Sequence, residues 1–153
     1  MNIRIAIPGD IPGIQFVRNA VRENRLSDPA IVPDHDVEDY ICRRGRGWVY
    51  ETEVGIVGFS IVSVTDCNVW ALFVLPGYEG NGIGRILHDS MMNWYFSQTA
   101  ETIWLSTGPQ TRAEAFYPRA GWERTGLTKT GEVKFEMTAA RWKSLHPSGN
   151  QLQ

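Results

Sequence analysis

The order of hydrophobic and polar positions along this chain predicts a protein of mixed strands and helices. Runs rich in β-branched and aromatic residues predict strands, and apolar positions three and four residues apart predict helices. The strands are expected at 2–7, 46–51, 55–64, 68–75, 101–107, 121–126 and 131–138. The helices are expected at 10–24, 36–44, 82–96 and 110–117, around an irregular stretch at 25–34. This order predicts an α+β fold, a three-layer α/β arrangement in which helices flank a twisted, mostly antiparallel sheet.

Residues 1–140 are expected to form one domain, and residues 141–153 a short helix and tail. A chain of 153 residues is an ordinary length for a single domain.

The predicted helix 82–96 has the most regular helical pattern. Apolar or small residues at helical spacing are expected to form one buried stripe, which comprises Ile83, Ile86, Leu87, Ser90, Met91, Trp94 and Tyr95. This orientation places His88 on the solvent side of the helix.

Charged residues of the first two helices are expected to face solvent. Arg18, Arg22 and Arg25 share one face, for which solvation is the stronger interpretation and carboxylate binding the alternative. Asp36 is expected to cap the second helix. The segment around it is acidic, which favours a cationic amine nearby, although capping and solvation explain it more simply; it contains Asp28, Asp34, Asp36, Glu38 and Asp39.

The most distinctive segment joins the strand 68–75 to the helix 82–96. It reads Glu79-Gly-Asn-Gly-Ile-Gly-Arg85, a glycine-dense turn that leaves backbone N–H groups at a helix N-terminus. Such a turn is a site for a phosphate or pyrophosphate, and glycines let a bulky anion approach the backbone. The alternative is that these glycines only make a tight turn.

Two familiar phosphate-binding motifs do not fit the spacing of this turn. The dinucleotide motif G-x-G-x-x-G requires glycine where Arg85 stands. The nucleotide-triphosphate loop requires Lys and Ser or Thr where Ile83 and Gly84 stand.

The residues 79–84 resemble the [Gln/Arg]-x-x-Gly-x-[Gly/Ala] signature of the GNAT superfamily of acetyl-CoA-dependent N-acyltransferases. A second segment, Gln110-Thr-Arg-Ala-Glu-Ala-Phe-Tyr-Pro-Arg-Ala-Gly-Trp122, resembles that family's motif Asn-x-x-Ala-x-x-Phe-Tyr-x-x-x-Gly-Phe. The opening residues 3–12 are similar to the family's first strand and turn, so the resemblance spans nearly the whole chain. It implies a GNAT-like mixed sheet whose central strands splay apart.

The resemblance implies that coenzyme A binds along this turn and the strand before it. The pyrophosphate of acetyl-CoA is expected on the N–H groups of residues 80–85, and its pantetheine arm between the strands ending near Val74 and Thr107. A backbone N–H near Phe73 is expected to stabilise a developing oxyanion. The implied cofactor-binding residues are Leu72, Phe73, Val74, Glu79, Gly80, Asn81, Gly82, Ile83, Gly84, Arg85 and Gln110.

Two of these positions depart from the family pattern. Glu79 replaces Gln or Arg, and its carboxylate is tolerable near a pyrophosphate only if it points to solvent or pairs with a cation such as Arg85. Gln110 replaces Asn, and its longer amide is expected to reach the cofactor.

Tyr117 stands where the family has its usual general acid. A phenol with a pKa near about 10 is protonated and can donate to a departing thiolate. The alternative is a tyrosine that only packs or hydrogen-bonds the sulfur. Pro118 disfavours helical geometry at Tyr117, so either the helix is expected to end there or the phenol is expected to tilt.

No general base is assigned. Some branches of the family have a carboxylate on the strand before the second motif, but here that strand offers Ser106. Glu51, Glu53 and Asp66 are interpreted as solvated turn residues, and a water relay is expected to remove the proton of the amine.

Composition limits the kinds of binding partner to be expected. The net charge of −2 gives no general attraction to nucleic acid, and no apolar run has the length of a membrane span. The N-terminal sequence lacks the pattern of a signal peptide, and Cys42 and Cys67 are expected to be unpaired thiols, which suits the cytoplasm. The three histidines share no metal-ligand spacing, so no metal is assigned.

The sequence therefore favours an N-acetyltransferase that moves an acetyl group from acetyl-CoA to a primary amine of a small molecule or peptide, by direct transfer in a ternary complex. Two alternatives stay open: a GNAT-fold module that binds acyl-CoA without turnover, and an unrelated phosphate-ligand binder. A homodimer is implied only by the resemblance.

Overall fold

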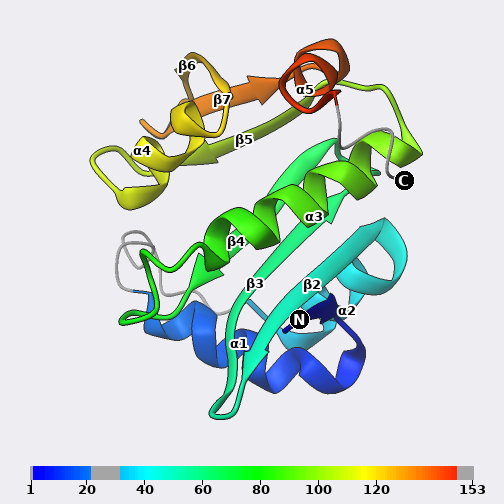
Figure 1. Ribbon diagram of the computed structural model, residues 1–153, viewed down its shortest axis with the longest axis vertical. Coiled ribbons are helices and arrows are strands. Elements are labelled where there is room, and N and C mark those ends of the chain that lie inside the picture. The colour runs from blue at the N-terminus through cyan, green and yellow to red at the C-terminus, as the bar shows by residue number, and fades with distance from the viewer. Residues whose placement is uncertain (1, 22–31, 148–153) are drawn as a thin grey trace. The chain divides into compact units, whose positions relative to one another are not determined.

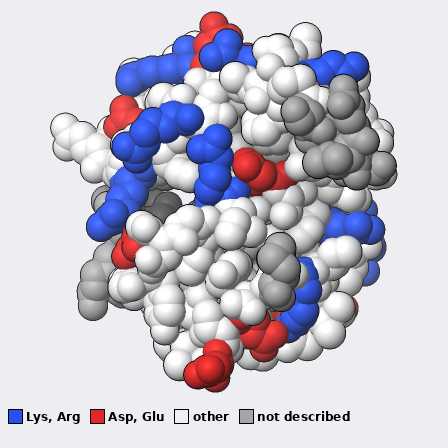
Figure 2. Space-filling model, in the orientation of Figure 1, with Lys and Arg blue, Asp and Glu red and all other residues white. Residues whose placement is uncertain are grey.

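The computed structural model describes residues 2–21 and 32–147 (Figure 1). The chain divides into two compact units, Met1–Tyr95 and Phe96–Gln153. Among the described residues no helix is both long enough and apolar enough to span a membrane. On the face drawn in Figure 2, Lys and Arg are interspersed with Asp and Glu.

The first unit contains an antiparallel sheet in the order β1-β2-β3-β4. Its strands are β1 (Ile3–Ile5), β2 (Gly45–Thr52), β3 (Gly55–Ser63) and β4 (Asn68–Val74). The register between β3 and β4 shifts after Ile61, which pairs with Ala71, while Val62 pairs with Val69. Trp70 is therefore an extra residue in β4, a β-bulge.

Helices cover both faces of this sheet because successive strand residues point to opposite sides (Figure 1). On one face lie η1 (Pro8–Asp10), α1 (Ile11–Ala20), α2 (Asp34–Asp39) and the π-helical turn η3 (Tyr40–Arg44). Their core with the sheet includes Ile14, Val17, Val37, Ile41, Val49, Phe59 and Ile61. On the other face α3 (Ile83–Gln98) approaches β3, where Ser60 Oγ donates to the Leu87 carbonyl at 3.2 Å.

The buried stripe of α3 differs from the predicted one, and the expectation for His88 was wrong. The buried residues are Ile83, Leu87, His88, Met91, Met92 and Tyr95, whereas Ile86 is 38% exposed. Compared with the prediction, the helix is rotated about its axis. Leu87 and Met91 lie at the centre of its buried face, and His88 lies beside them and is fully buried. Burial of the imidazole is tolerated because its Nδ1 lies 2.8 Å from Asp89 Oδ1, which supplies a polar partner.

The second unit has three antiparallel strands in the order β5-β7-β6. These are β5 (Ile103–Thr107), β6 (Glu123–Leu127) and β7 (Val133–Met137), accompanied by α4 (Arg112–Arg119) and α5 (Ala139–Leu145). The helix α5 begins two residues before the predicted position, because the Thr138 hydroxyl accepts the Arg141 N–H and caps it. Trp142 of α5 is buried and belongs to the packed part of this unit.

The element types follow the prediction, and all strand pairs described within the two units are antiparallel. The predicted N-cap of the second helix was wrong: α2 begins at Asp34 after Pro33, so Asp36 lies in its first turn. There Asp36 faces His35, with 3.3 Å between carboxylate and ring nitrogen. The last residues of the predicted helix 10–24 lie outside the described residues, and the splay of the central strands stays a prediction.

Candidate functional site

The segment between β4 and α3 folds as a succession of tight turns. The Tyr78 N–H donates to the Leu75 carbonyl at 3.0 Å, and the Asn81 side-chain amide donates to the Tyr78 carbonyl at 3.3 Å. Gly80 and Gly82 both have φ of 81°, a left-handed conformation that other residues adopt only at a cost. The glycines are therefore required by the backbone path itself.

The same turn leads into the N-terminus of α3, where the first backbone N–H groups have no partner within the helix. The first backbone bond of the helix runs from the Ile86 N–H to the Gly82 carbonyl at 3.0 Å, so the N–H groups of residues 83–85 precede the helical hydrogen bonds. The positive end of the helix dipole lies at these groups. A Cβ added at Gly80 or Gly82 would meet no atom within 4 Å, so the space beside the backbone is open. These features fit a phosphate or pyrophosphate.

The Glu79 carboxylate is held by the backbone of its own turn. Its Oε1 accepts the Gly77 N–H at 2.9 Å, which gives the carboxylate a partner outside the start of the helix. The cation suggested as its partner lies elsewhere, because Arg85 Nε is 3.4 Å from Asp89 Oδ1, one helical turn along α3. The departure from the family pattern at Glu79 therefore has a structural role in closing the turn.

The strand segment Leu72–Val74 lies at the edge of the first unit's sheet. Leu72, Phe73 and Val74 pair with Ser60, Phe59 and Gly58 of β3, and all three are partly exposed. The rings of Phe73 and Phe59 are 5.5 Å apart in an edge-to-face arrangement. On the side that faces β3, this segment pairs as an ordinary strand. Within the described part of the first unit, no strand pairs with its other edge.

The second motif begins with a helix cap, not with helix. Thr111 is the N-cap of α4, and its hydroxyl accepts the Glu114 N–H at 3.3 Å. The Glu114 carboxylate in turn accepts the N–H of Gln110, the residue before the N-cap, and so gives this backbone donor a partner. Gln110 is exposed and has φ of 62°, so the expectation that the helix starts at residue 110 was wrong. Contact between its amide and a cofactor stays a prediction.

Tyr117 is the buried residue of α4. It is 5% exposed, and its ring contacts those of Phe116, Trp122 and Phe135, with centroids 5.2, 5.5 and 6.0 Å away. Burial raises the pKa of the Tyr117 phenol well above its usual range, because the charged form loses its hydration. The phenol is therefore protonated at neutral pH.

The end of α4 explains the spacing of the motif between Tyr117 and Trp122. The Gly121 N–H donates to the Pro118 carbonyl and the Trp122 N–H to the Tyr117 carbonyl, both at 3.0 Å. Together with φ of 101° at Gly121, this is a Schellman motif, and the Tyr117–Trp122 ring contact is its hydrophobic component. The sequence offered Pro118 as a reason for the helix to end at Tyr117, but α4 continues to Arg119. A proline in the last turn forfeits a single N–H bond.

A carboxylate reaches Ser106 from the neighbouring part of the sheet, a feature that sequence reasoning missed. Ser106 Oγ donates to Glu132 Oε1 at 2.8 Å, although 26 residues separate the two. Lys134, which pairs with Ser106 across the strands, lies with its ammonium 5.4 Å from the Trp104 ring centroid. Only strand pairing brings Glu132 to Ser106, so no local pattern signals it.

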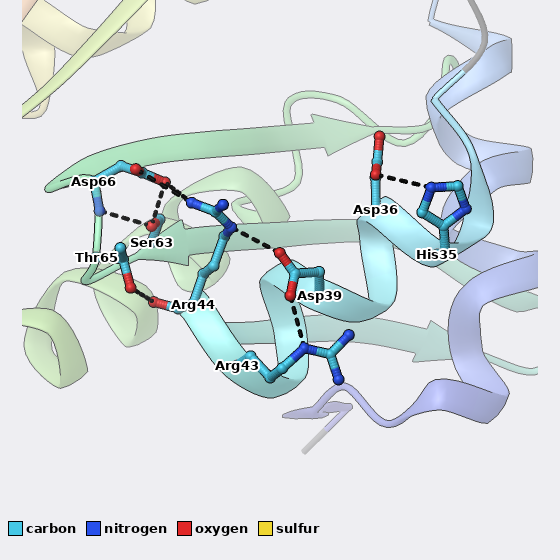
Figure 3. A network of polar contacts seen from close by, with 8 residues as sticks. All are labelled: His35, Asp36, Asp39, Arg43, Arg44, Ser63, Thr65 and Asp66. Atoms are coloured by element: carbon cyan, nitrogen blue, oxygen red, sulfur yellow. Dashed lines mark hydrogen bonds and ion pairs between the residues drawn. The ribbon is translucent and has the colours of Figure 1, made fainter.

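Carboxylates of the acidic segment take part in ion pairs (Figure 3). The Asp39 carboxylate accepts from Arg43 and Arg44 at 2.7 Å each, and these bonds lower the pKa of Asp39. Arg44 also contacts Asp66 at 3.0 Å, and Asp66 accepts from Ser63 Oγ at 2.8 Å. The network joins η3 to the turn after β3, which supports the structural interpretation of these charges. Asp28 lies outside the described residues.

Arg18 does not lie on a solvated helix face, which corrects the expectation for it. Its guanidinium carbon lies 5.4 Å from the Trp70 ring centroid and 5.6 Å from the Phe73 ring centroid. The side chain is half-buried, and burial lowers the pKa of Arg18. The bulge in β4 and the position of α1 produce this contact. Arg22 and Arg25 lie outside the described residues.

Comparison with known proteins identifies the family. The model of the Acetyltransferase (GNAT) family matches residues 17–122, which is more than half of the chain. The chain belongs to this family. A sequence comparison with curated proteins finds no match.

Solved structures of GNAT proteins have the same fold. Ribosomal-protein-alanine N-acetyltransferase from Brucella melitensis has a TM-score of 0.74 at 19% identity, covering 90% of this chain and 99% of that chain. The PaiA N-acetyltransferase from Thermoplasma acidophilum, solved with coenzyme A, has a TM-score of 0.75 at 14% identity, covering 90% and 99%. Phosphinothricin acetyltransferase from Sinorhizobium meliloti, solved with acetyl-CoA, has a TM-score of 0.71 at 17% identity, covering 90% and 89%.

Proposed function

We propose that this GNAT protein transfers an acetyl group from acetyl-CoA to a primary amine of a small molecule or peptide, by direct transfer in a ternary complex. The observation that carries the proposal is the turn before α3. Its left-handed glycines leave open space beside N–H groups at a helix N-terminus, in a chain of an acetyltransferase family. Structures of two similar GNAT proteins with coenzyme A and acetyl-CoA support this choice of ligand.

The residues that would hold acetyl-CoA have separable tasks. The N–H groups of Gly80 to Arg85 would bind the pyrophosphate, and the backbone of Leu72–Val74 would bind the pantetheine arm as an added strand does. The bound thioester supplies an activated acetyl group and a thiol leaving group. The protein's part is to orient that thioester, to exclude water and to manage the two protons of the reaction.

Tyr117 is the proposed general acid. The phenol is protonated at neutral pH and so has a proton to donate to a thiolate, whose ordinary pKa is about 8.5, although burial raises the pKa of Tyr117 and makes it a weaker acid than a solvated phenol. The Schellman motif and the ring of Trp122 hold the tyrosine in place. A positioned acid contributes about 10²- to 10⁴-fold to the rate.

The amine must lose a proton, and the proposed route is a water relay that ends at Glu132. This carboxylate is exposed to solvent and accepts a hydrogen bond from Ser106 of β5, the strand on which some GNAT branches carry an acid. A solvated carboxylate can take a proton through water without contacting the amine.

The second candidate function is a GNAT module that binds acyl-CoA without turnover. The deep burial of Tyr117 favours it, because a phenol that is 5% exposed has limited access to a substrate. β5 itself carries no acidic residue, which is consistent with either function.

Calorimetric titration with acetyl-CoA, free CoA and ATP, followed by thiol release over pools of amines, separates these functions. Binding of acetyl-CoA with amine-dependent thiol release is the expected result. Binding without release from any amine supports the module. Failure to bind acetyl-CoA overturns both.

A further inference from the structure

We propose that Arg18 binds a carboxylate of the acceptor, so that the substrate is an amine of amino-acid type that carries a free carboxylate. The inference rests on the proposed function and narrows its substrate class. It starts from a half-buried cation on α1 whose observed neighbours are aromatic rings.

Arg18 lies against β4 beside the bulge. Its guanidinium carbon is 5.4 Å from the Trp70 ring centroid and 5.6 Å from that of Phe73. The indole of Trp70 is itself fixed by stacking on Tyr40, with centroids 4.0 Å apart and planes 8° from parallel. The guanidinium therefore rests against a preformed aromatic surface.

The rings offset only part of the cost of burying this charge. A cation over an aromatic face is attracted to it, but the ring accepts none of the five in-plane N–H groups of the guanidinium. Among residues 2–21 and 32–147, Arg18 has no carboxylate within ion-pair distance. Burial also lowers its pKa, as expected for a cation that has lost hydration without gaining an anion.

Other arginines of the first unit are paired differently. Arg4 contacts Asp10 at 2.9 Å, Arg44 contacts Asp39 at 2.7 Å, and Arg85 lies 3.4 Å from Asp89. Within the described part of the chain these carboxylates thus go to arginines whose side chains are at least 40% exposed, whereas the half-buried Arg18 lies over two rings. A carboxylate from a ligand would form the paired, bidentate contact that arginine favours.

The position of Phe73 indicates which ligand brings that carboxylate. Phe73 belongs to the strand segment proposed to hold the acyl end of acetyl-CoA, so Arg18 lies beside the proposed place of reaction. An acceptor whose carboxylate binds Arg18 would need its amine close to that carboxylate, as in an amino acid. The N-terminus of a peptide carries an amide where a free amino acid carries a carboxylate, so this arrangement favours the free amino acid.

The test compares L-amino acids with their carboxamides as acceptors in the thiol-release assay, because the two differ in charge but little in shape. For accepted amino acids, the carboxamide is expected to be about 10- to 100-fold poorer in kcat/KM, the value of a hydrogen-bonded charge. Arg18→Gln should remove this preference mainly through KM, and Arg18→Lys should restore part of it. Equal use of acids and amides by the unaltered protein, or an unchanged preference in Arg18→Gln, overturns the proposal.

Arg46→Gln is the matched control. Arg46 also lies over a tryptophan, 4.8 Å from the Trp94 ring centroid, but on the strand β2. It should leave the preference for acids intact, and a loss equal to that of Arg18→Gln would mean a general effect of losing an arginine–tryptophan contact.

Calorimetric titration of the CoA complex with the same acids and amides tests the site without turnover. Binding of acids that weakens in Arg18→Gln supports the carboxylate site, even if thiol release never occurs and the transferase proposal fails. If no acid binds, or if acids bind Arg18→Gln equally well, the carboxylate site is refuted. The proposed function is tested separately, by acetyl-CoA binding and thiol release.

Discussion

Replacing Gly82 by alanine tests whether the turn before α3 binds coenzyme A. Gly82 has φ of 81°, and an alanine in this left-handed region costs about 1–2 kcal/mol. The alanine also restricts the unfolded chain, which returns about 0.4–1 kcal/mol. Because its Cβ would meet no atom within 4 Å, no clash adds to the free energy of folding. The expected net loss is about 1 kcal/mol, or a Tm lower by about 2–4 °C.

The effect on the cofactor should be much larger than the effect on stability. The new methyl group would occupy the space through which a phosphate reaches the N–H groups of residues 83–85. Loss of two charge-assisted hydrogen bonds, at about 1.5–3 kcal/mol each, weakens binding by more than about 100-fold. Calorimetric titration with acetyl-CoA measures this loss, and thermal unfolding of the same sample measures the stability.

Gly131→Ala is the control for backbone strain. Gly131 has φ of 87° and also has no atom within 4 Å of a built Cβ, but it lies in the turn between β6 and β7. The two variants should lose similar stability, and only Gly82→Ala should lose acetyl-CoA. Equal affinities in the two variants would refute the anion site at this turn.

Three further predictions concern protons and charges. Tyr117→Phe should lower turnover by about 10²-fold or more with nearly unchanged acetyl-CoA affinity, and unchanged turnover would remove Tyr117 as the acid. Glu132→Gln should lower turnover, whereas unchanged turnover would mean that the relay ends elsewhere; the hydrogen bond from Ser106 can survive on the amide oxygen. The Asp10 carboxylate is 8% exposed and accepts two hydrogen bonds from Arg4, which lower its pKa. Because the folded pKa is depressed, this stabilisation is present above about pH 4 and is lost as the pH falls through the folded pKa. Asp10→Asn should therefore cost about 1–2 kcal/mol at pH 7 in denaturant unfolding, and a difference from the unaltered protein that persisted undiminished in acid would contradict this pairing.

Features that depend on neighbours in sequence could be predicted. The glycines of the turn before α3 are required by a local backbone conformation, and the spacing from Tyr117 to Trp122 is that of a Schellman motif. Strand and helix types follow from periods of two and 3.6 residues, which also depend on the local chain. The family motifs are recognisable in the sequence for the same reason: each is a local structure with local requirements.

Features that depend on contacts between segments far apart in the chain could not be predicted from the sequence. The apolar spacing of α3 is compatible with more than one rotation of the helix, and packing against β3 selects the one that buries His88. The sequence predicts Arg18 to be a surface residue, whereas in the structure α1 packs against β4 and brings Arg18 onto the rings of Trp70 and Phe73. Glu132 reaches Ser106 only through strand pairing across 26 residues. The sequence alone determined the types of the elements, the glycine-rich turn before α3 and the family, whereas the tertiary structure decided helix rotation and the partners of individual charges, because these depend on packing between segments far apart in the chain.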